Sequence, residues 1–288
     1  MTLVIAQRND KGVSFSSDSR ISFGEAGFFD KGIKIFIVPF KLKGPAKSRE
    51  DFNKYEQELS YGLAVVGSSI NANTVKDSIA EILPNVTYLT NMSDVSIIGI
   101  SSLVLKYYRE VSQELTAVLG KTGLSEILLG GYCIVKKRVR IVRFYPDIKE
   151  DQVEYQFEEI LPEHGMMFFG SGKAYAEQVF KENETLDPLQ ILKKVIESKA
   201  DAAVGGNMQR GNFYGENFKI SGVVEDQLDE KGNSIKKTNY RRAFLVENEI
   251  EEFKKPPYLA LTYGYTSVKL GISGIVDTGF QSKVCTRL

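Results

Sequence analysis

The sequence has few of the residues that disulfide frameworks and metal sites require. Its 288 residues include two cysteines, Cys133 and Cys285, and a single histidine, His164. Two cysteines are too few for a disulfide framework. One histidine has no second histidine with which to form a zinc site. We therefore expect no metal and no cofactor, and we interpret His164 as a surface-loop residue.

Long apolar runs and an excess of one charge are also missing. The longest apolar stretches, such as residues 96–105, are interrupted by Gly and Ser and are shorter than the roughly 20 residues that cross a bilayer. The N-terminus becomes polar at residues 7–10, which leaves no room for a signal-peptide core. Lys and Arg together number 37, as do Asp and Glu, so no nucleic-acid partner is indicated. These features predict a cytoplasmic protein that does not bind membranes.

A nucleotide-binding loop is absent as well. Residues 170–173 read Gly-Ser-Gly-Lys, which suggests a phosphate loop. However, Met167 replaces the glycine that such a loop requires five positions before Gly172, and neither Ser nor Thr follows Lys173. Any use of ATP would therefore belong to a partner.

What is present is an ordinary globular composition, with 42% hydrophobic and 26% charged residues. Short runs favouring β-structure predict strands at residues 2–6, 13–17, 33–38, 61–66, 127–135, 139–145, 153–160, 218–225, 240–246, 258–265 and 269–276. Apolar stripes and capping signals predict helices at residues 75–83, at 97–118, from about 171, and from the Asp187-Pro188 start to Gly205-Gly206.

The order of these elements is strands, helices, strands, helices, strands. This order suits an α+β fold in which two sheets pack face to face with a helix layer outside each, a four-layer αββα sandwich. We predict a single domain over residues 1–288. The Lys- and Glu-rich residues 41–58 are expected to form a surface insertion, and residues 221–288 a C-terminal extension with further strands.

Three residues near the N-terminus are regularly spaced. Thr2 and Asp18 are sixteen positions apart, and Asp18 and Lys34 are sixteen positions apart again. Three further segments follow in order, Val-Val-Gly-Ser-Ser at 65–69, Gly-Ser-Gly-Lys-Ala-Tyr-Ala at 170–176 and Asp-Ala-Ala-Val-Gly-Gly at 201–206. With these segments, residues 2–220 resemble proteasome β subunits and the bacterial ATP-dependent peptidase HslV, which are N-terminal nucleophile (Ntn) hydrolases.

The resemblance implies a threonine hydrolase whose nucleophile is Thr2, exposed by removal of Met1. The free α-amine of an N-terminal threonine can act as the base, and such an amine titrates at roughly 7.7 to 8.0. Lys34 would disfavour protonation of that amine and stabilise negative charge on the Thr2 oxygen. Asp18 would hold and orient Lys34, in the manner of other catalytic triads.

Three further residues would complete such a site. The backbone N–H of Gly67, at a strand end with no Cβ to block approach, is the expected oxyanion donor. Ser171 and Asp201 are expected to surround the α-amine. Arg20 is expected to lie close to Asp18 and Asp201.

One residue departs from the family pattern. Proteolytic members have Ser or Thr where this chain has Val204, three positions after Asp201. The leading hypothesis is a peptidase that cuts unfolded chains inside a homo-oligomeric ring and works with a separate ATP-dependent unfoldase. The alternatives are an Ntn hydrolase for a specific small amide, and a non-catalytic scaffold subunit.

Overall fold

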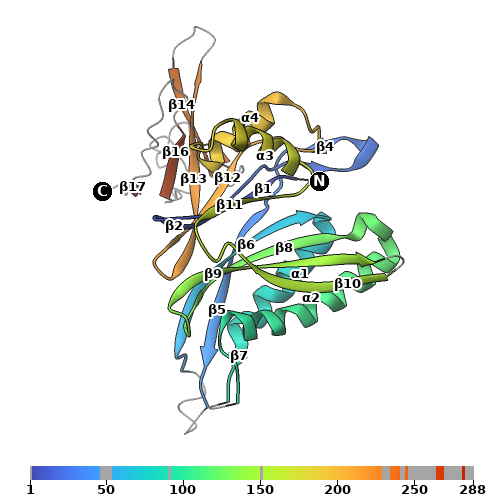
Figure 1. Cartoon of the computed structure of the whole chain (residues 1–288), viewed down its shortest axis with the longest axis vertical. Coiled ribbons are helices and arrows are strands. Elements are labelled where there is room, and N and C mark those ends of the chain that lie inside the picture. The colour runs from blue at the N-terminus through green and yellow to red at the C-terminus, as the bar shows by residue number, and fades with distance from the viewer. Residues whose placement is uncertain are drawn as a thin grey trace, which may run out of the picture.

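Two large β-sheets form the centre of the molecule (Figure 1). The computed structural model describes residues 2–45, 54–89, 92–149, 152–228, 234–240, 244–245, 264–268 and 281–282. Side chains are described up to Val224, with the exception of Glu25.

The first sheet contains the N-terminal hairpin. Its main path runs β11-β1-β2-β12-β13-β14-β15, and β16 pairs in parallel with β13 and antiparallel with β17. The strands are β1 (Val4–Asn9), β2 (Gly12–Ser17), β11 (Gly165–Phe169), β12 (Gln209–Tyr214), β13 (Asn217–Leu228), β14 (Ser234–Tyr240), β15 (Phe244–Leu245), β16 (Gly264–Val268) and β17 (Gln281–Ser282).

The second sheet has the order β10-β9-β8-β6-β5-β7. Its strands are β5 (Ile35–Lys43), β6 (Gln57–Gly67), β7 (Val86–Thr87), β8 (Ser125–Cys133), β9 (Arg138–Lys149) and β10 (Gln152–Ile160). A separate small hairpin is made of β3 (Ile21–Ser22) and β4 (Phe28–Phe29), joined by the 3-10 turn η1 (Gly24–Ala26). This hairpin lies between β2 and β5 in the chain.

Two pairs of helices form the outer layers (Figure 1). The helices are α1 (Ser69–Ile82), α2 (Ile97–Leu119), α3 (Lys173–Glu182) and α4 (Pro188–Ser198), and the other 3-10 turns are η3 (Leu83–Asn85) and η4 (Gly120–Gly123). No helix within the described ranges is long and apolar enough to cross a membrane.

The buried apolar residues separate into three clusters, one for each space between layers. The cluster between the sheets includes Val4 and Ala6, whereas Leu3 and Ile5 belong to the cluster under α3 and α4. The third cluster lies between the second sheet and α1 and α2. Successive side chains of a strand point to opposite faces, so β1 contributes side chains to two clusters. The predicted αββα sandwich is confirmed.

The predicted insertion at 41–58 starts and ends within strands that the structure describes. Strands β5 and β6 continue into it, and Lys41 pairs with Glu58 and Leu42 with Gln57. Burial of Leu42 and a salt bridge of 3.0 Å between Lys41 and Glu58 explain why the ladder extends this far. Residues 46–53 lie outside the described residues.

The prediction that the fourth helix ends at Gly205-Gly206 was wrong. Helix α4 starts as predicted, with an Asp187 capping box, but it ends at Ser198. The next residue, Lys199, has left-handed dihedral angles (φ 53°, ψ 21°), a conformation that stops a helix. Asp201 therefore lies in a loop and not in a helical turn.

The predicted tail strands are described only in part. The strand at 218–225 corresponds to β13, and the one at 240–246 falls on the end of β14 and on β15. Of the strand at 258–265, the structure describes the last two residues, at the start of β16. The strand at 269–276 lies outside the described residues.

Candidate active site

The β1–β2 hairpin brings Thr2 and Asp18 together. Val4 pairs with Ser17 at the end of the ladder, so Asp18 follows directly after β2 at the level of the residues before β1. The Asp18 N–H donates to the Leu3 carbonyl (3.3 Å). Thr2 and Asp18 are both buried, with exposed fractions of 2% and 0%. The spacing of sixteen residues is thus the length of one hairpin.

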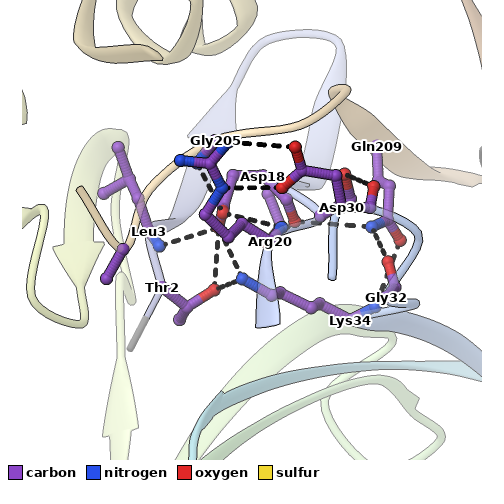
Figure 2. A network of polar contacts seen from close by, with 12 residues as sticks. Thr2, Leu3, Asp18, Arg20, Asp30, Gly32, Lys34, Gly205 and Gln209 are labelled. Atoms are coloured by element: carbon purple, nitrogen blue, oxygen red, sulfur yellow. Dashed lines mark hydrogen bonds and ion pairs between the residues drawn. The ribbon is translucent and has the colours of Figure 1, made fainter. Parts of the chain in front are cut away.

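The Asp18 carboxylate is the centre of a hydrogen-bond network (Figure 2). Its five donors are the Thr2 hydroxyl (2.8 Å), the Leu3 N–H (3.0 Å), the Arg20 N–H (3.1 Å), the Gly205 N–H (3.1 Å) and the Lys34 ammonium (2.8 Å). A buried carboxylate needs such donors because water no longer solvates its charge. The network therefore fixes the orientation of Asp18.

Lys34 is the only other charged group that contacts the Thr2 hydroxyl in the described part of the chain. Its side chain is buried and its ammonium donates both to Asp18 Oδ1 and to Thr2 Oγ1. Burial lowers the pKa of Lys34 below its ordinary value, and the Asp18 carboxylate opposes that shift. Thr2 Oγ1, Asp18 Oδ1 and Lys34 Nζ thus contact one another. The Lys34 side chain therefore points into the site and not toward solvent.

The chain reaches Lys34 from Asp18 through the β3–β4 hairpin. The Gly32 N–H donates to the Ser19 carbonyl (2.9 Å), which closes this excursion. Beyond it, the Lys34 carbonyl accepts from the Val65 N–H (3.0 Å) on β6. Lys34 therefore lies where the chain leaves the first sheet and enters the second.

Arg20 and Asp30 join the two ends of the same hairpin. The Arg20 guanidinium makes two hydrogen bonds to the Asp30 carboxylate (2.6 and 2.9 Å), and these raise the pKa of Arg20. It also donates to the Ala202 carbonyl (2.9 Å). The expectation for Arg20 is met at its backbone, since its N–H donates to Asp18, while its side chain contacts the loop next to Asp201.

The segment before α3 encloses the backbone of Thr2. A Cβ on Gly170, where φ is +95°, would lie 2.1 Å from the Thr2 carbonyl oxygen, and the Gly172 N–H donates to that oxygen (3.3 Å). Ser171 lies between them and is exposed. The structure describes both Ser171 and Thr2, and no hydrogen bond joins the Ser171 hydroxyl to Thr2. Ser171 is close in sequence to this contact, but its expected role stays a prediction.

Asp201 has one carboxylate oxygen without a partner. Its Oδ1 accepts from the Ala203 N–H (2.9 Å), whereas its Oδ2 is buried and has no hydrogen-bond partner among the described residues. Val204 is 2% exposed and packs in the apolar cluster that contains Leu3. The position of the family hydroxyl is therefore filled by apolar packing.

Gly67 is the last residue of β6 and requires glycine. Its φ is +91°, and a Cβ there would lie 2.6 Å from the Leu124 carbonyl oxygen. It lies two residues beyond Val65, whose N–H bonds to Lys34. Nothing in the described residues joins Gly67 to Thr2 directly, so its role as an oxyanion donor stays a prediction.

Three residues of the site were not predicted. Asp30 and Gln209, whose Oε1 accepts from the Lys34 N–H, carry no motif, although Asp30-Lys31-Gly32 has turn composition. Gly205 was interpreted as a helix stop, yet its N–H donates to Asp18 and a Cβ there would lie 2.5 Å from Arg20 Cζ. The adjacent glycines were the available signal for this close approach. Across the described ranges, no group of three His, Cys, Asp or Glu residues is placed to hold a metal ion.

Comparisons with known proteins identify the fold. No family model matches the sequence, and no curated protein matches it. Among solved structures, the Anbu (ancestral beta-subunit) protein from Yersinia bercovieri is similar, with a TM-score of 0.52, 16% identity, and coverage of 76% of this chain and 86% of that one. The Anbu complex from Pseudomonas aeruginosa gives a TM-score of 0.51 at 17% identity, covering 76% of this chain and 85% of that one.

These matches correct the expected relationship. The similar structures are Anbu proteins, so the assignment to proteasome β subunits and HslV was wrong. The Anbu proteins share the proteasome-like Ntn fold, which explains why the segment order in this sequence pointed in that direction. At 16–17% identity the comparison establishes the fold alone. The chain has the proteasome-like Ntn hydrolase fold of the Anbu structures.

Proposed function

We propose that this protein is a threonine-type amide hydrolase that acts through Thr2 after Met1 is removed. The observation that carries the proposal is the mutual contact of the Thr2 hydroxyl, the Asp18 carboxylate and the Lys34 ammonium in a buried site. A scaffold has no use for a lysine buried against a hydroxyl, since burying a charge costs free energy. The proteasome-like Ntn fold supports the same reaction class.

In the proposed reaction, the Thr2 oxygen attacks the amide carbonyl of the substrate. The hydroxyl proton passes to the free α-amine of Thr2, directly or through a water. The Lys34 ammonium stabilises negative charge on the attacking oxygen, and Asp18 keeps Lys34 in place. Collapse of the tetrahedral intermediate transfers the proton to the leaving amine and forms a Thr2 ester, which water then hydrolyses.

The unpartnered oxygen of Asp201 supports a role for the free amine. A buried carboxylate oxygen without a donor is costly, and a new ammonium or amine N–H on Thr2 would be a suitable donor. Removal of Met1 creates such a group. We therefore propose that Asp201 and Ser171 lie around the mature N-terminus, and that the Gly67 N–H receives the oxyanion.

The substrate is proposed to be a peptide, and the chain a single domain that assembles with copies of itself. The Anbu complex from P. aeruginosa forms a helical assembly, which favours self-association in this fold. The three interlayer clusters share strands, which supports one folding unit. Native mass spectrometry of the full chain would test assembly, and a strictly monomeric protein would contradict it.

The central proposal is tested by intact-mass analysis with and without a small β-lactone, which acylates an activated hydroxyl. The expected result is a protein that lacks Met1 and gains one acyl group, while Thr2→Ala gains none. Retention of Met1 in cell-made protein would refute the amine mechanism. Mature protein that is not acylated would favour the scaffold alternative.

A further inference from the structure

Gln209 is the first residue of β12 and belongs to none of the motifs that the sequence presents. It is 4% exposed and pairs with Ser17, the residue before Asp18. Its carboxamide reaches from the first sheet toward the segment that leads into the second (Figure 2). A buried carboxamide has one acceptor oxygen and two donor hydrogens that require partners.

All three sites of the Gln209 carboxamide are used, and all three partners are backbone groups near the candidate nucleophile. Oε1 accepts from the Lys34 N–H (3.1 Å). Nε2 donates to the Gly32 carbonyl (2.8 Å) and, at 3.4 Å, to the Asp18 carbonyl. One side chain therefore holds the main chain of both charged residues that contact Thr2.

This arrangement matters because Asp18 and Lys34 belong to different layers. Asp18 follows β2 of the first sheet, whereas Lys34 precedes β5 of the second and bonds to Val65 on β6. A small shift between the sheets would change the separation of Asp18 Oδ1 and Lys34 Nζ. Catalytic groups require placement to within about 0.5 Å, which neighbouring hydrogen bonds usually provide.

We propose that Gln209 is a positioning residue that sets the distance between Asp18 and Lys34 by bracing the two sheets at the site. The inference rests on the proposed function, in which these two groups activate Thr2. The three partners of Gln209 are backbone groups, so it acts on the reaction through the placement of Asp18 and Lys34. No shorter or apolar side chain offers the same acceptor and two donors at this reach.

The test compares Gln209→Met with the wild type in acylation of Thr2 by the β-lactone, followed by intact mass at several reagent concentrations. Methionine is similar in length but lacks the donors and the strong acceptor. We expect the maximal acylation rate to fall by about 10- to 100-fold, the size of effect that a misplacement near 1 Å produces. The half-saturating reagent concentration should stay unchanged.

Asn71→Leu is the matched control. Asn71 is also a fully buried carboxamide. Its NH2 group donates to the Gly123 carbonyl (2.7 Å), and its oxygen accepts from the Ser112 hydroxyl (3.1 Å). It lies on α1, in the helix layer that covers the second sheet. Both variants should lower the melting temperature, and only Gln209→Met should lower the acylation rate. If Gln209→Met does not fold, Gln209→Asn, which is too short to serve all three partners, takes its place.

The outcomes separate the two proposals. A wild type that is not acylated at Thr2 would refute the proposed function, and the positioning role with it. An acylated wild type with a folded Gln209 variant that reacts within about twofold of it would overturn the role of Gln209 alone. Equal slowing in Asn71→Leu would also overturn it, because the effect would then follow from lost stability.

Discussion

Replacing Asp18 by Asn tests whether the buried charge pair holds the site together. The substitution keeps the shape of the side chain and removes its charge. The amide NH2 group that Asp18→Asn introduces would face N–H donors or the Lys34 ammonium, since both oxygens of Asp18 now accept hydrogen bonds from such groups. The Lys34 ammonium, with a side chain 6% exposed, would lose its counter-ion.

The size of the effect follows from this geometry. Removing one partner of a buried ion pair costs about 3–5 kcal/mol, because the remaining charge is left uncompensated. For a protein of this size, each kcal/mol corresponds to about 2–4 °C in the melting temperature. We therefore expect Asp18→Asn to lower the melting temperature by roughly 6–20 °C. The loss should be smaller at alkaline pH, where Lys34 can become neutral.

The assay is urea denaturation of Asp18→Asn, Lys34→Met and the double variant. The double variant contains no unpaired buried charge, so it should recover at least about 1 kcal/mol relative to the sum of the single losses. Additive losses would show that Asp18 and Lys34 are not coupled. A loss below about 1 kcal/mol in Asp18→Asn would refute the view that Asp18 compensates a buried charge.

Three further predictions concern the surroundings of the site. Burial lowers the pKa of Lys34, so between that pKa and 10.5 the folded protein binds fewer protons than the unfolded one. The free energy of unfolding should therefore rise with pH in this range. Urea titrations of Lys34→Met should lack this part of the rise. Gly170→Ala should lower the melting temperature much more than Gly215→Ala. Both residues have positive φ, which costs about 1–3 kcal/mol for other residues, but of the two only the Cβ at Gly170 would meet backbone atoms. Equal losses in the two variants would contradict this. Asp187→Ala should lower the free energy of unfolding, measured by urea denaturation, by about 2–5 kcal/mol, because it removes a helix cap and the 2.8 Å partner of the nearly buried Arg210. A loss of about 1 kcal/mol, no larger than that of a cap alone, would show that Arg210 finds another partner.

The layers of the fold could be predicted because they depend on local patterns. The apolar stripes of α1 and α2 and the Asp187-Pro188 start of α4 are signals within a few residues of one another. Strand β12 was missed because its sequence, Gln-Arg-Gly-Asn-Phe-Tyr, is mostly polar and contains a glycine. It forms a strand because it lies between β2 and β13, where the ladders on both sides satisfy its backbone.

Within the candidate site, the contact between Thr2 and Asp18 could be predicted because the chain itself fixes their distance. Thr2 and Asp18 are joined by one hairpin, so their separation in sequence determines their contact in space. Gln209 reaches Lys34 across 175 positions of sequence, and no local pattern reports such a contact. Composition gives no indication of a role for Asp30 either, because its contact with Arg20 depends on how the β3–β4 hairpin folds back.

The equal spacings from Thr2 to Asp18 and from Asp18 to Lys34 arise from two different structures. The first sixteen residues form a regular ladder, in which a shift of one residue would turn Asp18 to the opposite face of the sheet. The second sixteen form an excursion that contains the short β3–β4 hairpin and that the Gly32–Ser19 hydrogen bond and the Arg20–Asp30 pair hold closed. An excursion whose ladder is this short tolerates changes of length at its tip, whereas the residues that close it must stay fixed. The identity of the residues that close the excursion, Ser19, Arg20, Asp30 and Gly32, is therefore more informative about the site than the number of residues between Asp18 and Lys34.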